Sequence, residues 1–351
     1  MILLIAAPAA AATRLPAPPR NLFDVPRPAA PPRDVVLSRP SAAAARISAS
    51  ASGERYPVND GSEDSIAVSV TAACQATCTA ADPQQIANFV GTLIHGNEIN
   101  LLTVQLDTPF QVGFDCGFDA ESCYYSGLNK IVLSGDETVD SDGASRDYVL
   151  AHEYGHHVAQ HRGVPPPFPA AINWGPERWS SYEHVCRGRR SGALFPGNEG
   201  THYYQDPGEA WAESFAHYRF PEAPVKWEWI PSLKPNAAAF RAIREDTLHP
   251  WRGRTSFKLR GLAAGRGGAA TVESFRTPLD GEVSLGPVGE PGLGYQLSLS
   301  NPSGKVLRSS RRGATFHHRL DYTVCGQPRL RVAVRSTRPG ADPFRLTVQR
   351  P

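Results

Sequence analysis

The sequence predicts an α+β protein in which a domain with a mixed sheet and one prominent helix precedes an all-β sandwich. Residues 57–250 alternate strand-like runs with segments of helical period. From residue 256 onward a period of two dominates, and turn residues separate the runs. The charge changes as well: residues 57–250 hold 12 Lys and Arg against 25 Asp and Glu, a net charge of −13, whereas residues 251–351 hold 17 against 6, a net charge of +11.

The first 56 residues are expected to lie outside both domains. Residues 1–12 are apolar and end in small side chains, which is typical of a signal peptide-like segment. Residues 13–56 are rich in Pro, Ala, Ser and Arg, as in a disordered pro-region or linker. No stretch approaches the ~20 apolar residues of a membrane-spanning helix. We therefore expect a secreted protein, extracellular or associated with the cell wall, without integral membrane association. The 31 Arg against five Lys indicate a GC-rich, bacterial genome.

The elements of the first domain follow from hydrophobic period and helix-start signals. Strands are expected at Ser65–Thr71, Leu101–Leu106, Gln111–Phe114, Cys123–Tyr125 and Lys130–Ser134. Helices are expected from Asp82-Pro83 to about Leu93, from about Ser145 to His161, at about 207–219 and at Asn236–Ile243. The helix that includes His161 carries the strongest signal.

The second domain, residues 256–351, shows the alternation of an antiparallel sandwich. Its expected strands are Thr271–Phe275, Glu282–Leu285, Tyr295–Leu299, Leu330–Val334 and Phe344–Val348. Turn residues such as Asp280-Gly281 and the run Asn301–Gly304 separate them. Two packed sheets are the usual solution for such a pattern.

Six cysteines are an even number, which favours disulfide bonds in an exported protein. Cys116 and Cys123 flank a short loop and form a natural local pair. Cys74 and Cys78 pair either with each other or elsewhere. A bridge between the remaining Cys186 and Cys325 would tie the two domains together. Six cysteines allow 15 connectivities, so the sequence leaves the pairing open.

Chemistry is concentrated in the segment His152-Glu153-Tyr154-Gly155-His156. Residues four apart share one helical face, so His152 and His156 can bind one metal ion. Glu153 points to the side, where it can accept a proton from a water molecule. This HExxH arrangement predicts one Zn²⁺ per chain, with His152 and His156 as ligands and Glu153 as general base. A chance match of the five-residue pattern is the competing reading.

A catalytic zinc ion usually has three protein ligands. The extended pattern HExxHxxGxxH is excluded, because Ala159 and Arg162 occupy the positions that need Gly and His. Downstream, Glu209 and Glu213 share one face of a predicted helix. Glu209 is our third ligand, and Glu213 is expected to accept the free ring N–H of a zinc-bound histidine.

Glu209 also fits a simpler role at the helix end. Asp206 as N-cap, Pro207 at the first position and Glu209 at the third are typical of a capped helix. A cap does not explain Glu213, one turn later. Should Glu209 not be the ligand, Glu213 is the next choice and Asp206 the one after it.

The HEYGH segment followed by Glu209-Ala210-Trp211-Ala212-Glu213 resembles gluzincin metallopeptidases. The resemblance covers roughly residues 65–220. It implies a zincin-like catalytic domain, zinc on His152, His156 and Glu209, and endopeptidase activity on protein or peptide substrates. It also implies a tyrosine before the glutamate ligand that stabilises the oxyanion. Tyr203 and Tyr204 both lie in that window, and Tyr203 is our choice. We expect an edge strand within 122–134 to align the substrate.

Residues 268–350 resemble the bacterial pre-peptidase C-terminal domain found in many secreted peptidases. Its basic character suggests either docking onto the acidic first domain or contact with an anionic cell surface. We expect no nucleic-acid partner. Two other functions stay open: a catalytically inactive adhesion protein with a peptidase fold, and a zinc amidase acting on cell-wall peptides.

Overall fold

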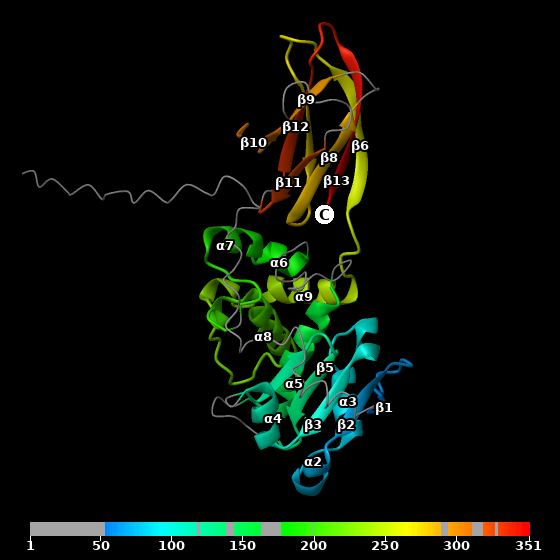
Figure 1. Cartoon of the computed structure of the whole chain (residues 1–351), viewed down its shortest axis with the longest axis vertical. Helices are drawn as coiled ribbons and strands as arrows, with labels where there is room; N and C mark the ends of the chain where they lie inside the picture. The colour runs from blue at the N-terminus through cyan, green and yellow to red at the C-terminus, as the bar shows by residue number, and fades with distance from the viewer. Residues whose placement is uncertain are drawn as a thin grey trace, which may run out of the picture.

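The computed structural model describes residues 53–117, 120–137, 144–162, 177–198, 200–288, 294–310, 319–326 and 329–351 (Figure 1). The signal peptide-like segment 1–12 and nearly all of the predicted linker 13–56 lie outside the described residues. The α+β class is confirmed, because helices and a mixed sheet precede two antiparallel sheets.

The first domain is built on a five-stranded sheet in the order β1-β2-β3-β5-β4. Its strands are β1 (Glu54–Pro57), β2 (Ser65–Val70), β3 (Thr103–Asp107), β4 (Ser122–Tyr125) and β5 (Lys130–Ser134). β2, β3 and β5 are parallel, and β1 and β4 pair antiparallel at the two edges. The predicted edge position of the segment that forms β4 is therefore confirmed.

Helices and short 3-10 turns complete this domain. They are α2 (Ala72–Thr77), α3 (Pro83–Gly91), η1 (Asn97–Leu101), α4 (Pro109–Cys116), α5 (Arg146–Gln160), α6 (Arg178–Tyr182), α7 (Val185–Ser191), η3 (Tyr203–Gln205), α8 (Pro207–Arg219), η4 (Pro231–Leu233) and α9 (Ala237–Leu248). Within the described residues, none of the helices is both long and apolar enough to cross a membrane.

Two sequence predictions need correction. The strand predicted at Gln111–Phe114 is wrong, because this segment lies in helix α4. Thr108 caps that helix by accepting a hydrogen bond from the backbone of Gln111, and Pro109 occupies its first turn. The ordered part also begins earlier than residue 57, since β1 starts at Glu54 and pairs with β2.

Helices α5 and α8 pack closely against each other. Each begins at a capped residue: Ser145 accepts from the backbone of Tyr148, and Asp206 accepts from that of Gly208. At their contact lies Gly155, where an added Cβ would come within 2.9 Å of the Cα of Ala212. Only glycine permits this approach, which brings the inner faces of the two helices together (Figure 1).

The second domain consists of two four-stranded antiparallel sheets around one apolar core. One sheet has the order β10-β9-β12-β7 and the other β11-β8-β13-β6. The strands are β6 (Thr255–Ala263), β7 (Thr271–Arg276), β8 (Gly281–Val288), β9 (Tyr295–Ser300), β10 (Val306–Ser309), β11 (Leu320–Val324), β12 (Arg329–Ser336) and β13 (Asp342–Arg350). The predicted all-β architecture of this part is confirmed.

All six cysteines form disulfide bonds, as the sequence predicts. Cys74 pairs with Cys78, and Cys116 on α4 pairs with Cys123 on β4. The third bond joins Cys186 on α7 to Cys325, which follows β11. This bond ties the sandwich covalently to the first domain. Arg190 Nη2 supports the junction by donating to the Thr323 carbonyl at 2.7 Å.

Candidate metal centre

Three polar side chains converge between α5 and α8. His152 and His156 project from α5, with 3.2 Å between their Nε2 atoms. Glu209 on α8 faces both rings: Oε2 lies 3.4 Å from His152 Nε2, and Oε1 lies 3.4 Å from His156 Nε2. The two expected histidine ligands and the expected glutamate ligand thus come together from segments more than 50 residues apart in the sequence.

The spacing of these atoms fits a zinc ion. Ligands at about 2.0–2.1 Å from a tetrahedral zinc lie about 3.3 Å from one another. In the structure the two Nε2 atoms lie 3.2 Å apart, and each lies 3.4 Å from one oxygen of the Glu209 carboxylate, Oε2 for His152 and Oε1 for His156. Two imidazoles and one carboxylate also form a donor set that zinc prefers. The residues therefore fit the metal that the sequence predicts.

Glu213 fixes the orientation of His152. Its Oε2 lies 3.0 Å from His152 Nδ1, and its Oε1 accepts a 2.6 Å hydrogen bond from the Tyr148 hydroxyl. Burial acts to raise the pKa of Glu213, but the contacts with His152, His217 and Tyr148 outweigh it and lower the pKa to about 2. An ionised Glu213 keeps a proton of His152 on Nδ1, so that a metal ion would displace only the proton on Nε2.

We expect Glu213→Gln to weaken zinc binding by about 10–100-fold, because it removes the charge that orients and polarises His152. Competition with a chromophoric chelator measures this affinity. Glu222→Gln is the matched control, since Glu222 is exposed and follows the same helix. An unchanged zinc affinity in Glu213→Gln would show that Glu213 does not act through the ligand.

The candidate ligands change one another's pKa values. Burial opposes the charge on His152, but its contacts with Glu209 and Glu213 raise its pKa well above the ordinary value. Burial likewise opposes ionisation of Glu209, but the adjacent His156 and His152 hold its pKa below the ordinary value. The site therefore favours positive charge. Because protons and a metal ion compete for the same atoms, zinc affinity should fall as the pH falls.

The helix cap and the candidate third ligand are separate residues. Asp206 is the N-cap of α8 and accepts from Gly208 N at 2.7 Å. Glu209 faces the two histidines instead of the helix end. Burial and the nearby Glu209 charge raise the pKa of Asp206 to about 7. The capping role therefore leaves the Glu209 carboxylate available to a metal ion.

Glu153 lies beside this group and is buried. Its Oε1 accepts a 2.5 Å hydrogen bond from the hydroxyl of Ser122, the first residue of edge strand β4. The charge of Glu153 contributes to the raised pKa of both His152 and Tyr203, which places it within electrostatic reach of the ligands. The hydrogen bond from Ser122 thus fixes the Glu153 carboxylate beside the three converging side chains, and Glu153 is not one of those three.

Aromatic rings border the same group. Tyr203, in η3, keeps 38% of its surface exposed, and burial together with the charges of Glu209 and Glu153 raises its pKa. Its ring lies 5.9 Å from that of Trp229, which in turn lies 6.3 Å from the His152 ring. Tyr204 is 48% exposed and stacks edge-on against Tyr203 at 5.4 Å.

The sequence did not single out Ser122, Tyr148 or Trp229. Tyr148 lies four residues before His152 on the same helix, so helical spacing alone carried a signal for it. Ser122 contacts Glu153 only because β4 pairs with β5 at the sheet edge, and no local pattern reports that.

Comparison with models of protein families finds no match, and comparison with curated proteins finds none either. Among solved structures, the pre-peptidase C-terminal domain of a Bacillus anthracis collagenase is 14% identical, with a TM-score of 0.22, and the match covers 26% of this chain and 88% of that one. A Yersinia pseudotuberculosis mitogen is 10% identical (TM-score 0.22, covering 28% and 86%). A Bacillus licheniformis lipase in its propeptide form is 12% identical (TM-score 0.20, covering 82% and 60%). Likenesses this low bear on neither activity nor substrate.

Proposed function

We propose that this chain is a secreted zinc-dependent endopeptidase with a gluzincin-like catalytic domain. The observation that supports it best is the convergence of two Nε2 atoms 3.2 Å apart on α5, each 3.4 Å from one oxygen of Glu209 on α8, with the buried Glu153 carboxylate beside them. Disulfide bonds at all six cysteines support export, since such bonds persist in oxidising compartments.

In this proposal, zinc, when bound, supplies a Lewis acid that lowers the pKa of a water toward ~7 and polarises the scissile carbonyl. Glu153 accepts a proton from the attacking water. Ser122 occupies its Oε1, which leaves Oε2 to hold that proton. Glu153 then delivers the proton to the leaving amine. Glu213 keeps the His152 ring in one tautomer throughout.

Edge strand β4 is suited to bind the substrate backbone. Among the described residues only β5 pairs with it, so its other side can add an extended peptide. Its first residue contacts Glu153, so a peptide bound along β4 passes the general base. The Cys116–Cys123 disulfide fixes this strand to α4.

Tyr203→Phe is expected to lower kcat by about 10²-fold or more with little change in KM, because the hydroxyl would donate to the oxyanion only in the transition state. Steady-state kinetics on a fluorogenic peptide measures both constants. Tyr204→Phe is the matched control on the adjacent, more exposed ring. Equal losses in the two variants would remove Tyr203 from the mechanism.

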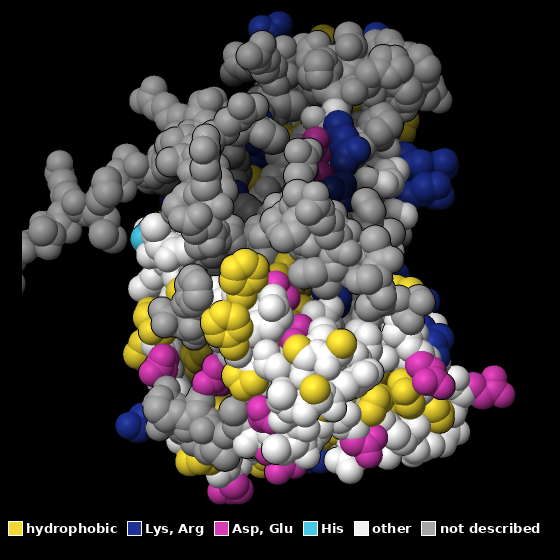
Figure 2. Space-filling model, turned by 60° about the horizontal axis from the view of Figure 1, so that its bottom comes forward, with side chains coloured by type: hydrophobic (Ala, Val, Ile, Leu, Met, Phe, Trp, Pro, Cys, Tyr) yellow, Lys and Arg dark blue, Asp and Glu magenta, His cyan; other side chains and the backbone are white. Residues whose placement is uncertain are grey.

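We further propose that the sandwich, similar to pre-peptidase C-terminal domains, contacts an anionic cell surface. Arg260 on β6 lies directly opposite Arg345 on β13, and Arg276 on β7 opposite Arg329 on β12. All four are exposed, and none forms an ion pair with a described residue. Like charges directly opposite one another cost stability. Figure 2 shows most visible acidic side chains on the domain below the sandwich and several basic ones on the sandwich.

The double variant Arg260→Glu/Arg345→Glu should elute from an anionic matrix at clearly lower salt than the wild type. The two changes weaken the attraction between the sandwich and the matrix, so less salt is needed to screen it. The double variant Arg241→Glu/Arg244→Glu, at two exposed positions on α9, is the control with the same change in net charge, and it should elute close to the wild type. If the two double variants shift equally, net charge rather than this face is responsible.

A further inference from the structure

Helix α5 carries a third histidine, His157, that takes no part in the candidate metal centre. Its side chain is fully buried, and both of its ring nitrogens have partners outside that centre. Nε2 lies 2.8 Å from the backbone carbonyl oxygen of Glu98 in η1, and Nδ1 lies 3.0 Å from the hydroxyl of Tyr124 in β4. The helix that carries the candidate ligands is therefore in direct contact with the edge strand.

The partners of His157 fix the direction of both hydrogen bonds. A carbonyl oxygen can only accept, so His157 donates from Nε2 to Glu98. Burial lowers the pKa of His157 to about 3, so the neutral ring has no second proton, and Nδ1 accepts from the Tyr124 hydroxyl. The same hydroxyl lies 3.2 Å from Oδ1 of Asn129, which is the longer of these two contacts. Tyr124 thus donates a hydrogen bond from β4 to α5.

Two hydrogen bonds join β4 to α5 in matching steps. Ser122 and Tyr124 lie two residues apart on the strand and so share one face of it. Glu153 and His157 lie four residues apart on the helix and share one face there. Ser122 donates to Glu153 at 2.5 Å, and Tyr124 donates to His157 at 3.0 Å. Two residues of a strand span about 6.6–6.8 Å and four residues of a helix about 6 Å, so the two bonds form side by side.

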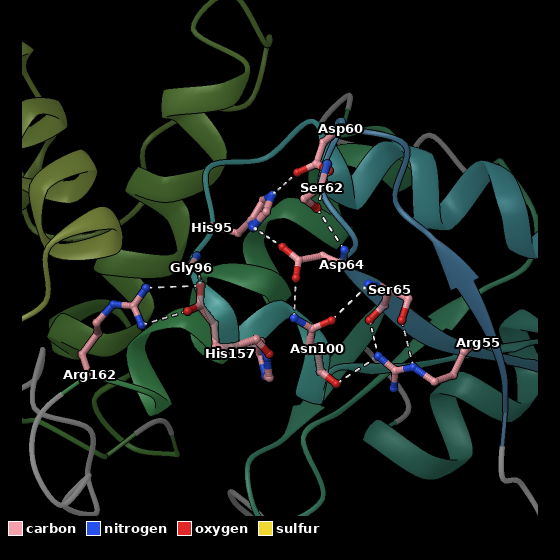
Figure 3. Close-up of polar contacts among 11 residues, drawn as sticks. Arg55, Asp60, Ser62, Asp64, Ser65, His95, Gly96, Asn100, His157 and Arg162 are labelled. Carbon is pink, nitrogen blue, oxygen red and sulfur yellow. Dashed lines mark hydrogen bonds and ion pairs between the residues drawn. The ribbon is translucent and has the colours of Figure 1, made fainter.

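The other partner of His157 is itself held in place. Glu98 Oε1 accepts from Gly96 N at 2.7 Å and lies 3.2 Å from Arg162 Nη2, just after α5 (Figure 3). Arg162 also donates to the Thr247 carbonyl at 2.9 Å, and both Glu98 and Arg162 are buried. Because the η1 side of the ring is fixed in this way, His157 offers Tyr124 an acceptor at a fixed position.

We infer that His157 and Tyr124 are positioning residues, which set the place of β4, and with it of a peptide bound along β4, relative to Glu153. The inference rests on the proposed peptidase function and adds a preference in substrate length to it. A peptide that extends past Ser122 to lie beside Tyr124 gains from this fixed strand, whereas a short peptide that reaches only the cleaved bond does not. The preferred substrate is therefore an extended, unfolded segment of a longer chain.

The opposite face of β4 provides a matched control. The Tyr125 hydroxyl donates to the Asp115 carbonyl at 2.8 Å on the side of α4, where the Cys116–Cys123 disulfide also holds the strand. Tyr124→Phe and Tyr125→Phe each remove one hydroxyl and its hydrogen bonding from adjacent positions. Only the face of Tyr125 keeps a covalent link, so only Tyr124→Phe should let β4 move relative to Glu153.

The test measures KM and kcat of the full chain with two fluorogenic peptides that share one scissile bond, of which only the longer extends along β4 at both ends. For the longer peptide, Tyr124→Phe should raise KM about fivefold, the equivalent of one hydrogen bond of about 1 kcal/mol. Its kcat should change little, because Ser122 still orients Glu153. The KM of the shorter peptide should stay the same, and Tyr125→Phe should change neither KM. Thermal unfolding checks that the two variants lose similar stability.

His157→Phe removes the acceptor and should raise the KM of the longer peptide as Tyr124→Phe does. In the double variant KM should rise little further, because both changes remove the same bond. Three results would overturn the inference: an unchanged KM in Tyr124→Phe, an equal rise for both peptides, or an equal rise in Tyr124→Phe and Tyr125→Phe. Each of them, beside an active wild type, leaves the proposed function intact. A wild type that cleaves neither peptide would contradict the proposed function, and the inference with it.

Discussion

Glu153→Gln is expected to lower kcat/KM for peptide hydrolysis by about 10²–10⁴-fold while zinc stays bound, since the amide cannot accept the proton of the attacking water. The change keeps the size of the side chain and its contact with Ser122, so the fold and the ligands should remain. A fluorogenic peptide assay and elemental analysis of the same preparation measure the two quantities.

Ser122→Ala is an informative companion to that variant. It leaves the carboxylate in place and removes only the 2.5 Å hydrogen bond that orients it, so its loss of activity should be much smaller than that of Glu153→Gln. Activity in Glu153→Gln close to that of the wild type would contradict the assignment of the general base.

Glu209→Gln should abolish both zinc binding at this site and peptide hydrolysis. The loss of zinc affinity should exceed the about 10–100-fold expected when an outer partner such as Glu213 is changed, because a ligand itself is lost. The physical reason is visible in the geometry: Glu209 is the only carboxylate within 3.4 Å of both Nε2 atoms among the described residues.

The control for this variant is Asp206→Asn, which keeps an N-cap on α8, because asparagine caps about as well as aspartate. It should retain zinc. If Asp206→Asn loses the metal while Glu209→Gln keeps it, the ligand is Asp206 and not Glu209. Asp206 is the last of the three choices that the sequence analysis offers for this ligand.

Local signals account for the parts of the fold that the sequence predicts well. Ser145 and Asp206 cap α5 and α8 at the expected positions, so the faces that carry His152 and Glu209 follow from helical spacing. The wrong prediction of a strand in the segment that forms α4 has a local cause as well. The short apolar run around Val112 is typical of a strand, but Thr108-Pro109 before it starts a helix.

The features that could not be predicted from the sequence depend on contacts between residues far apart in the chain. The contact of Ser122 with Glu153 depends on the order of the strands. The contact of His95, which lies between α3 and η1, with Asp60 depends on the position of the β1–β2 loop. Such contacts join residues 20 or more positions apart, beyond the reach of periodicity.

The proposed function depends on zinc binding by His152, His156 and Glu209. Anomalous diffraction from crystals of the zinc-loaded chain, measured on both sides of the zinc absorption edge, locates the ion. We expect a strong peak about 2.0–2.2 Å from the Nε2 atoms of both histidines and from a carboxylate oxygen of Glu209. The absence of a peak between α5 and α8, or a peak there without Glu209 among its ligands, would contradict it.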